Sequence, residues 1–158
     1  MAIVFITGLS GVGKSSALYQ LGKLGFNVVD TDYGYTKTVK NGTIEELVWD
    51  EEKIQALLLM YSNEHLFLSG CYINQGKFYK NFDYVVLLKA EIDVMLERVE
   101  KRTTNDYGKS TEDRTKILES VVNVLPLLER GANVVIDTTK SDIETVCSQL
   151  VSILNQNI

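Results

Sequence analysis

The chain has 158 residues, of which 45% are hydrophobic and 23% are charged, and its formal net charge is -5. This length and balance are typical of one globular domain with its own core, so residues 1–158 are predicted to form a single domain. The negative charge argues against a nucleic-acid-binding surface, and no apolar stretch approaches the ~20 residues that a membrane span requires.

The first predicted element is a short buried strand over residues 2–7, followed by a glycine-rich loop and a helix over residues 16–22. The loop, GLSGVGKS, fits the G-x-x-x-x-G-K-[ST] pattern of a phosphate-binding loop, and the order of strand, loop and helix is the one this motif requires. Its backbone N–H groups and the helix N-terminus are expected to hold the phosphates of a nucleotide. The predicted phosphate contacts are Gly8, Ser10, Gly11, Val12, Gly13, Lys14, Ser15 and Ser16.

The rest of the chain alternates apolar strands with amphipathic helices. The further strands are predicted over residues 26–30, 66–68, 84–88 and 134–136. The further helices are predicted over residues 51–63, 91–102, 111–129 and 142–155. Asp50 is expected to cap the first of these helices, Pro126 to kink or shorten the third, and Ser141 or Asp142 to cap the last. Residues 33–49 are predicted to be irregular or weakly helical.

Five strands that alternate with helices predict an α/β fold, in which helices cover both faces of a parallel sheet. In such folds ligands bind beside the carboxyl ends of the strands. Four polar segments fall at those ends: the glycine loop and residues 30–32, 69–71 and 137–140. The sequence therefore predicts one ligand site, built from segments that are far apart in the chain.

Two aspartates, Asp30 and Asp32, follow the second predicted strand. Two carboxylates beside a bound triphosphate can organise Mg²⁺ and accept a proton from an acceptor hydroxyl. Ser15, Asp30 and Asp32 are the predicted Mg²⁺ ligands, and Asp32 is the predicted general base because it lies farther from the strand end. A strand-end turn with two solvated aspartates is the alternative.

Two arginines, Arg98 and Arg102, lie four residues apart and share one face of the helix predicted over residues 91–102. Their guanidinium groups can grip phosphates, and Arg102 is the predicted cation that stabilises the transition state beside the catalytic Lys14. The polar segment that follows, about residues 103–110, is predicted to be a lid. Surface ion pairs with neighbouring carboxylates are the alternative for the arginines.

The chain resembles the small P-loop kinases in four motifs taken in combination. They are GLSGVGKS, DTD after the second strand, ERVEKR before a polar segment and IDTTKS at the last strand. This group contains shikimate kinase, gluconate kinase and the nucleoside monophosphate kinases, and the resemblance covers nearly the whole chain. It implies a P-loop NTPase-like three-layer sandwich with a lid, in which the five-stranded parallel sheet has the order 2-3-1-4-5. It also implies ATP and Mg²⁺ as cofactors.

The resemblance further implies roles for particular residues. Asp30 and Asp32 would handle the metal and the acceptor hydroxyl, Arg98 would pack against adenine, and Arg102 would lie on the phosphates. The segment after the last strand would lie along the adenine, with Thr138 and Lys140 as contacts.

The acceptor-binding region, about residues 33–64, departs from that group. It contains no arginine, although arginine forks normally hold phosphate or carboxylate acceptors. The third strand ends in SGCY, with neither the acid nor the arginine that adenylate kinases have there. The region instead contains the aromatic residues Tyr33, Tyr35, Trp49 and Tyr61. They favour an acceptor with a flat or sugar-like face, and core packing is the alternative.

The predicted function is ATP-dependent transfer of the γ-phosphate to a hydroxyl of a small-molecule acceptor. The alternatives are a nucleoside or nucleotide kinase, and a nucleotide-binding regulatory module with little turnover. A cytoplasmic monomer or homodimer is expected, with no nucleic-acid or membrane partner. The two cysteines, Cys71 and Cys147, have no metal-site spacing and predict no disulfide framework.

The lid hypothesis predicts that nucleotide protects residues 103–110 from backbone hydrogen exchange. The segment is polar and lies between cationic helix ends, so bound phosphates should draw it over the loop. We expect its exchange to slow when ATP and Mg²⁺ are added, as measured by mass spectrometry. Unchanged exchange in this segment, with slowed exchange in the glycine loop, would contradict a lid.

Overall fold

The computed structural model describes residues 1–102 and 107–155. A five-stranded parallel sheet forms its centre, with the strand order β2-β5-β1-β6-β7. The strands are Ile3–Thr7 (β1), Asn27–Asp30 (β2), Leu66–Ser69 (β5), Tyr84–Lys89 (β6) and Val134–Asp137 (β7). Counted within this sheet, the order is the predicted 2-3-1-4-5, because the labels β3 and β4 belong to a separate hairpin.

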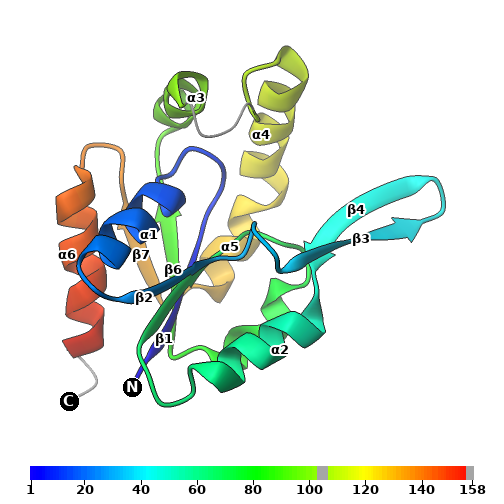
Figure 1. Cartoon of the computed structure of the whole chain (residues 1–158). Coiled ribbons are helices and arrows are strands. Elements are labelled where there is room, and N and C mark those ends of the chain that lie inside the picture. The colour runs from blue at the N-terminus through cyan, green and yellow to red at the C-terminus, as the bar shows by residue number, and fades with distance from the viewer. Residues whose placement is uncertain (103–106, 156–158) are drawn as a thin grey trace.

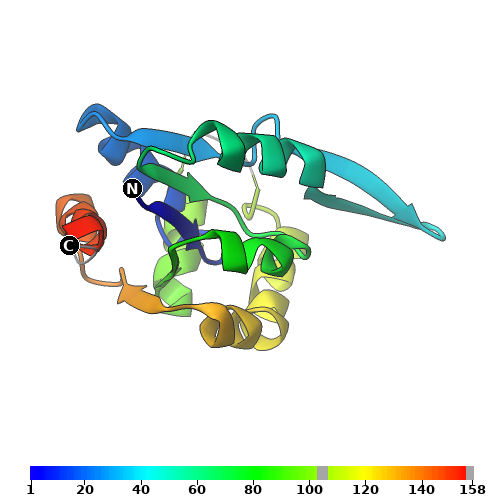
Figure 2. The ribbon, with the colours of Figure 1, turned by 90° about the horizontal axis from the view of Figure 1, so that it is seen from below.

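Helices cover both faces of the sheet (Figures 1 and 2), which confirms the predicted three-layer α/β class. Alternate residues of β1 point to opposite layers. The helices are Lys14–Lys23 (α1), Glu51–Met60 (α2), Gln75–Asn81 (η1, a 3₁₀ helix), Ile92–Lys101 (α3), Thr111–Asn123 (α4), Leu125–Gly131 (α5) and Ile143–Leu154 (α6). Val4 and Ile6 pack in one core cluster with α1 and α6, whereas Ile3 and Phe5 pack in a second cluster with α2 and η1. Within the described residues, no helix is long and apolar enough to span a membrane.

The prediction for residues 33–49 was wrong, because this segment contains an antiparallel hairpin. Its strands are Thr36–Asn41 (β3) and Ile44–Trp49 (β4), joined by the two-residue loop of Gly42 and Thr43. The hairpin projects from the body of the molecule (Figures 1 and 2). A short loop containing glycine is a hairpin signal, but the polar composition of β3 concealed it at the sequence level.

Two helix boundaries follow from local side chains. The helix predicted over residues 111–129 is divided into α4 and α5, and Pro126 lies in the first turn of α5, where its missing N–H costs no hydrogen bond. Asp142, rather than Ser141, caps α6, since its carboxylate accepts the N–H of Thr145 at 2.8 Å. Asp50 caps α2 as predicted, and accepts the N–H of Lys53.

Trp49, at the end of the hairpin, is fully buried. Its ring packs edge-on against Phe5, with ring centroids 5.3 Å apart, and its Nε1–H donates to Thr31 Oγ1 at 2.9 Å. The Thr31 hydroxyl in turn donates to the carbonyl of Ser69 at 2.6 Å. Core packing therefore accounts for Trp49, and the hypothesis that its ring is offered to an acceptor was wrong.

This packing leaves no room for a side chain at Gly70. A Cβ there would meet the Thr31 hydroxyl oxygen and come within 3.3 Å of the Trp49 ring. We expect Gly70→Ala to lower the free energy of unfolding by about 1–3 kcal/mol, the usual cost of overpacking, in urea denaturation. Gly76→Ala is the matched control, because a Cβ at Gly76 meets nothing within 4 Å. Equal stability of the two variants would contradict the close packing at Gly70.

Candidate active site

The phosphate loop connects β1 to α1, and α1 begins at Lys14. The ammonium of Lys14 donates to the carbonyls of Gly8 at 2.6 Å and Leu9 at 3.0 Å. Burial within the loop lowers the pKa of Lys14, while the nearby Cys71 and the acidic side chains oppose that effect. The loop thus holds a desolvated cation beside its backbone N–H groups, as a phosphate-binding site requires.

Arg98 and Thr138 hold the loop from outside. The Arg98 guanidinium donates to the carbonyl of Gly11 at 3.3 Å and to the hydroxyl and carbonyl of Thr138 at 3.0 and 2.5 Å. The Thr138 hydroxyl donates to the carbonyl of Val12 at 2.7 Å. A side chain at Gly11 would collide with the backbone carbonyl of Met95, so the loop packs directly on α3. The sequence analysis assigned Arg98 and Thr138 to adenine and did not foresee this bracing contact.

The acidic pair lies beside the first turn of α1. The Ser15 hydroxyl donates to Asp30 Oδ2 at 3.3 Å, and the other oxygen of Asp30 accepts the N–H of Asp32 at 3.0 Å. Burial raises the pKa of the Asp30 carboxyl. Over residues 1–102 and 107–155, no group of three or more His, Cys, Asp or Glu side chains is placed to hold a metal. Ser15 and Asp30 fit Mg²⁺ instead, because this ion takes one or two protein oxygens and completes its shell with phosphates and waters.

Asp32 has a partner that the sequence analysis missed. The Tyr72 hydroxyl, at the loop after β5, donates a short hydrogen bond to Asp32 Oδ1. Burial, together with this hydrogen bond and the charge of Asp32, raises the pKa of Tyr72, so the phenol stays protonated. The two residues are 40 positions apart, and only the pairing of β2 with β5 brings them together.

Arg102 lies at the end of α3, half-buried. It donates from Nη2 to the carbonyl of Tyr107 at 2.6 Å, and burial lowers the pKa of its guanidinium. Its Nε is buried without a hydrogen-bond partner among the described residues. Arg114 forms an ion pair with Glu100 at 2.9 Å, and its Nε, like that of Arg102, has no hydrogen-bond partner among the described residues.

The predicted lid is described only in part, since residues 103–106 lie outside the described residues. Gly108 is buried and donates its N–H to the Asp113 carboxylate at 3.1 Å. The structure packs Gly108 closely against Val99 of α3 and Ile117 of α4, although a glycine in a predicted lid suggests a flexible position. The closing of a lid remains a prediction.

The predicted site residues meet in one cleft of about 1600 Å³ at the carboxyl ends of the strands. The phosphate contacts named from Gly8 to Ser16 all line this cleft, together with Asp32, Tyr72, Arg98, Arg102 and Thr138. In the described part of the chain, Asp30 and Lys140 are not in its lining, and Lys140 is exposed. The volume exceeds the ~300–1,000 Å³ that is usual for a pocket that holds one small ligand.

The sheet order, the phosphate loop and the cleft define a small protein with the P-loop kinase fold. Comparisons with solved structures agree. Shikimate kinase from Acinetobacter baumannii in complex with shikimate is 17% identical, with a TM-score of 0.68, over 99% of this chain and 94% of that chain. Shikimate kinase from Bacteroides thetaiotaomicron is 15% identical, with a TM-score of 0.63, over 98% of each chain. At such low identity these likenesses establish the fold and not the substrate.

A family model described as an AAA domain, AAA_18, matches residues 4–119. Because this match covers more than half of the chain, the protein belongs to that AAA domain family. No curated protein matches the chain.

The position of Lys14 predicts that its substitution affects nucleotide binding and leaves the fold intact. We expect Lys14→Ala to abolish binding of ATP in calorimetry, because the variant removes the ammonium that lies inside the loop. Its circular dichroism should match that of the wild type. Lys23→Ala, at the exposed end of α1, is the control and should bind as the wild type does. Equal affinity of Lys14→Ala and the wild type would refute the assignment of the loop.

Proposed function

We propose that this protein transfers the γ-phosphate of ATP to a hydroxyl of a small-molecule acceptor. The observation that carries the proposal is that Lys14, Asp32 and Arg102 line the same cleft. They come from the phosphate loop, the end of β2 and the end of α3. These are the groups that phosphoryl transfer needs: a cation on the phosphates, a carboxylate for the attacking hydroxyl, and a second cation for the developing charge.

The Asp32–Tyr72 pair supports a positioned base. The protonated phenol of Tyr72 occupies one oxygen of the carboxylate, which fixes its orientation. The second oxygen then accepts the proton of the acceptor hydroxyl as its oxygen attacks the γ-phosphorus. The bond between the γ-phosphorus and the β–γ bridging oxygen breaks, and ADP leaves.

The cations act on the phosphates during this transfer. Lys14 would exchange its contacts with the loop carbonyls for the β- and γ-phosphates, and Arg102 would direct the unpartnered Nε–H toward the transferred group. Mg²⁺, held by Ser15 and Asp30 together with the phosphates, would supply further neutralisation of the phosphate charge. Positioning and charge stabilisation account for most of catalysis in this class of reaction.

Two other functions share the same nucleotide site. A nucleoside or nucleotide kinase would differ only in its acceptor, and a regulatory module would bind nucleotide with little turnover. The hydrogen bond between Tyr72 and Asp32 favours an enzyme, since a binding module has no need for a carboxylate of fixed orientation in the cleft. A soluble, small-molecule acceptor is the proposed second substrate.

The variant Asp32→Asn tests whether the protein is an enzyme or a binding module. We expect the variant to keep its affinity for ATP and to lose about 10²-fold or more in phosphoryl transfer, the usual contribution of a positioned base. ATP hydrolysis, in which water replaces the acceptor, provides the measurement. Tyr72→Phe should lower the same rate by a smaller factor, because it removes only the group that orients the carboxylate.

Asp93→Asn is the matched control, since Asp93 is exposed on α3 and outside the cleft lining in the described part of the chain. It should leave the rate unchanged. Hydrolysis that is equal in Asp32→Asn and the wild type would remove Asp32 from the mechanism. A wild type that binds ATP but neither hydrolyses nor transfers its phosphate would favour the regulatory module.

A further inference from the structure

Three elements other than the phosphate loop and α3 contribute exposed apolar side chains to the lining of the cleft, and we call these side chains the apolar wall. Leu47 on β4 is 58% exposed, Ile73 after β5 is 79% exposed, and Leu127 on α5 is 58% exposed. All three line the cleft that also contains Asp32. Single exposed apolar residues are common, but several that gather on one concave surface mark a binding site.

We infer that the acceptor is an alcohol with an uncharged, apolar body, which packs against Leu47, Ile73 and Leu127 while its hydroxyl meets Asp32. This inference rests on the proposed phosphotransfer and specifies its substrate class. The sequence analysis favoured a flat or sugar-like acceptor because of the aromatic residues in positions 33–64. The structure buries Trp49 in the core, and the exposed aliphatic side chains of Leu47, Ile73 and Leu127 line the cleft.

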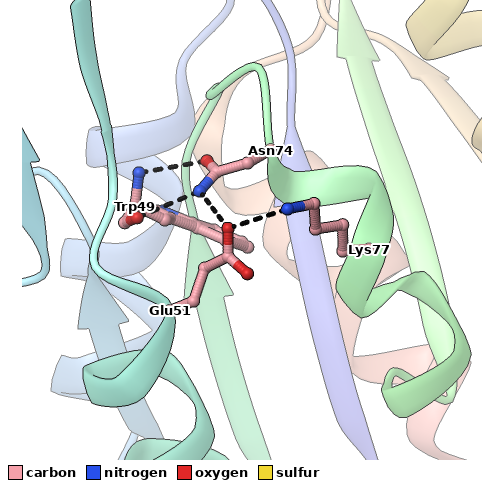
Figure 3. A network of polar contacts seen from close by, with 4 residues as sticks. All are labelled: Trp49, Glu51, Asn74 and Lys77. Carbon is pink, nitrogen blue, oxygen red and sulfur yellow. Dashed lines mark hydrogen bonds and ion pairs between the residues drawn. The ribbon is translucent and has the colours of Figure 1, made fainter. Parts of the chain in front are cut away.

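A hydrogen-bonded clamp joins two parts of this wall (Figure 3). The Asn74 carboxamide accepts the N–H of Trp49 at 3.1 Å and donates to the carbonyl of Trp49 at 3.0 Å. It also donates to the Glu51 carboxylate at 3.1 Å, and Lys77 binds that carboxylate at the same distance. Asn74 therefore fixes the end of β4 against the loop after β5. Ile73 directly precedes Asn74 and Leu47 lies two residues before Trp49, so the clamp fixes the backbone beside both side chains.

The distribution of charge supports an uncharged acceptor. Among the described residues that line the cleft, the cationic side chains are Lys14, Arg98, Lys101 and Arg102. They belong to the phosphate loop, to α3 and to its C-terminal end, and none of them comes from the elements that contribute Leu47, Ile73 and Leu127. Lys77, which is near the apolar wall, is paired with Glu51. An acceptor carboxylate or phosphate on that wall would lie among aliphatic groups, where an unpaired anion is costly.

Matched pairs of alcohols test this inference. The probes are benzyl alcohol against 4-(hydroxymethyl)benzoate, and 1-hexanol against 6-hydroxyhexanoate, each assayed for phosphate transfer from ATP labelled at the γ-position. We expect kcat/KM for each neutral alcohol to exceed that for its carboxylate partner by at least about 10-fold, because among the described residues no cationic side chain from β4, the loop after β5 or α5 lines the cleft. Higher kcat/KM for the carboxylates would overturn the inference.

Leu47→Asp and Ile44→Asp form the matched variant pair. Leu47 and Ile44 both lie on β4 and have exposed fractions of 58% and 63%, but of these two residues only Leu47 lines the cleft. Leu47→Asp should lower kcat/KM for the neutral alcohols by about 10-fold or more through a higher KM, whereas Ile44→Asp should have no effect. Equal effects of the two variants would overturn the inference. Light scattering provides a second test. If the wild type is a dimer and Leu47→Asp is a monomer, the inference is also overturned, because a second copy of the chain would then cover the apolar wall.

The failure of this inference is distinguishable from the failure of the proposed function. If the wild type hydrolyses ATP in a manner that depends on Asp32 but transfers phosphate to neither neutral alcohol, the inference is wrong and the phosphotransferase stands. If the wild type binds no ATP, both are wrong.

Discussion

The geometry of the nucleotide site depends on the bracket that Arg98 and Thr138 form around the phosphate loop. A loop that collects backbone N–H groups around an empty centre would relax without support, because its amide dipoles repel one another. Here the carbonyls of Gly11 and Val12 are held by donors 87 and 126 residues farther along the chain. The anion site is consequently organised by the packing of α3 and the end of β7, and a bound phosphate has little ordering left to impose.

The proposed acceptor side of the cleft has a second fixed point, the buried indole of Trp49. Its ring is held in the core by Phe5 and its Nε1–H by Thr31, while its backbone is held by Asn74. Thr31 lies between Asp30 and Asp32, so the residue that satisfies the indole also fixes the turn that presents the two carboxylates. Packing and polar satisfaction in the core thus determine where the acidic pair points.

The sequence predicted the sheet and the phosphate loop because both depend on local patterns, namely buried apolar runs and a motif with fixed spacing. It missed the hairpin at Thr36–Trp49 since β3 is polar and makes its main contacts with its partner strand β4. It also missed the Tyr72–Asp32 hydrogen bond. No local pattern links residues 40 positions apart, and their contact exists only because β2 and β5 are neighbours in the sheet.

The two sides of the cleft are built from different parts of the fold, which has a consequence for specificity. The proposed catalytic groups follow the strands of the sheet and the start and end of its covering helices, so the topology itself brings them together. The apolar wall comes from the hairpin, from the loop after β5 and from α5, which are connections outside the sheet. Substitutions in those connections can change which kind of acceptor the cleft binds without moving the phosphate loop. The same P-loop fold can therefore serve acceptors of different charge, and likeness in fold to the shikimate kinases does not determine what this cleft binds.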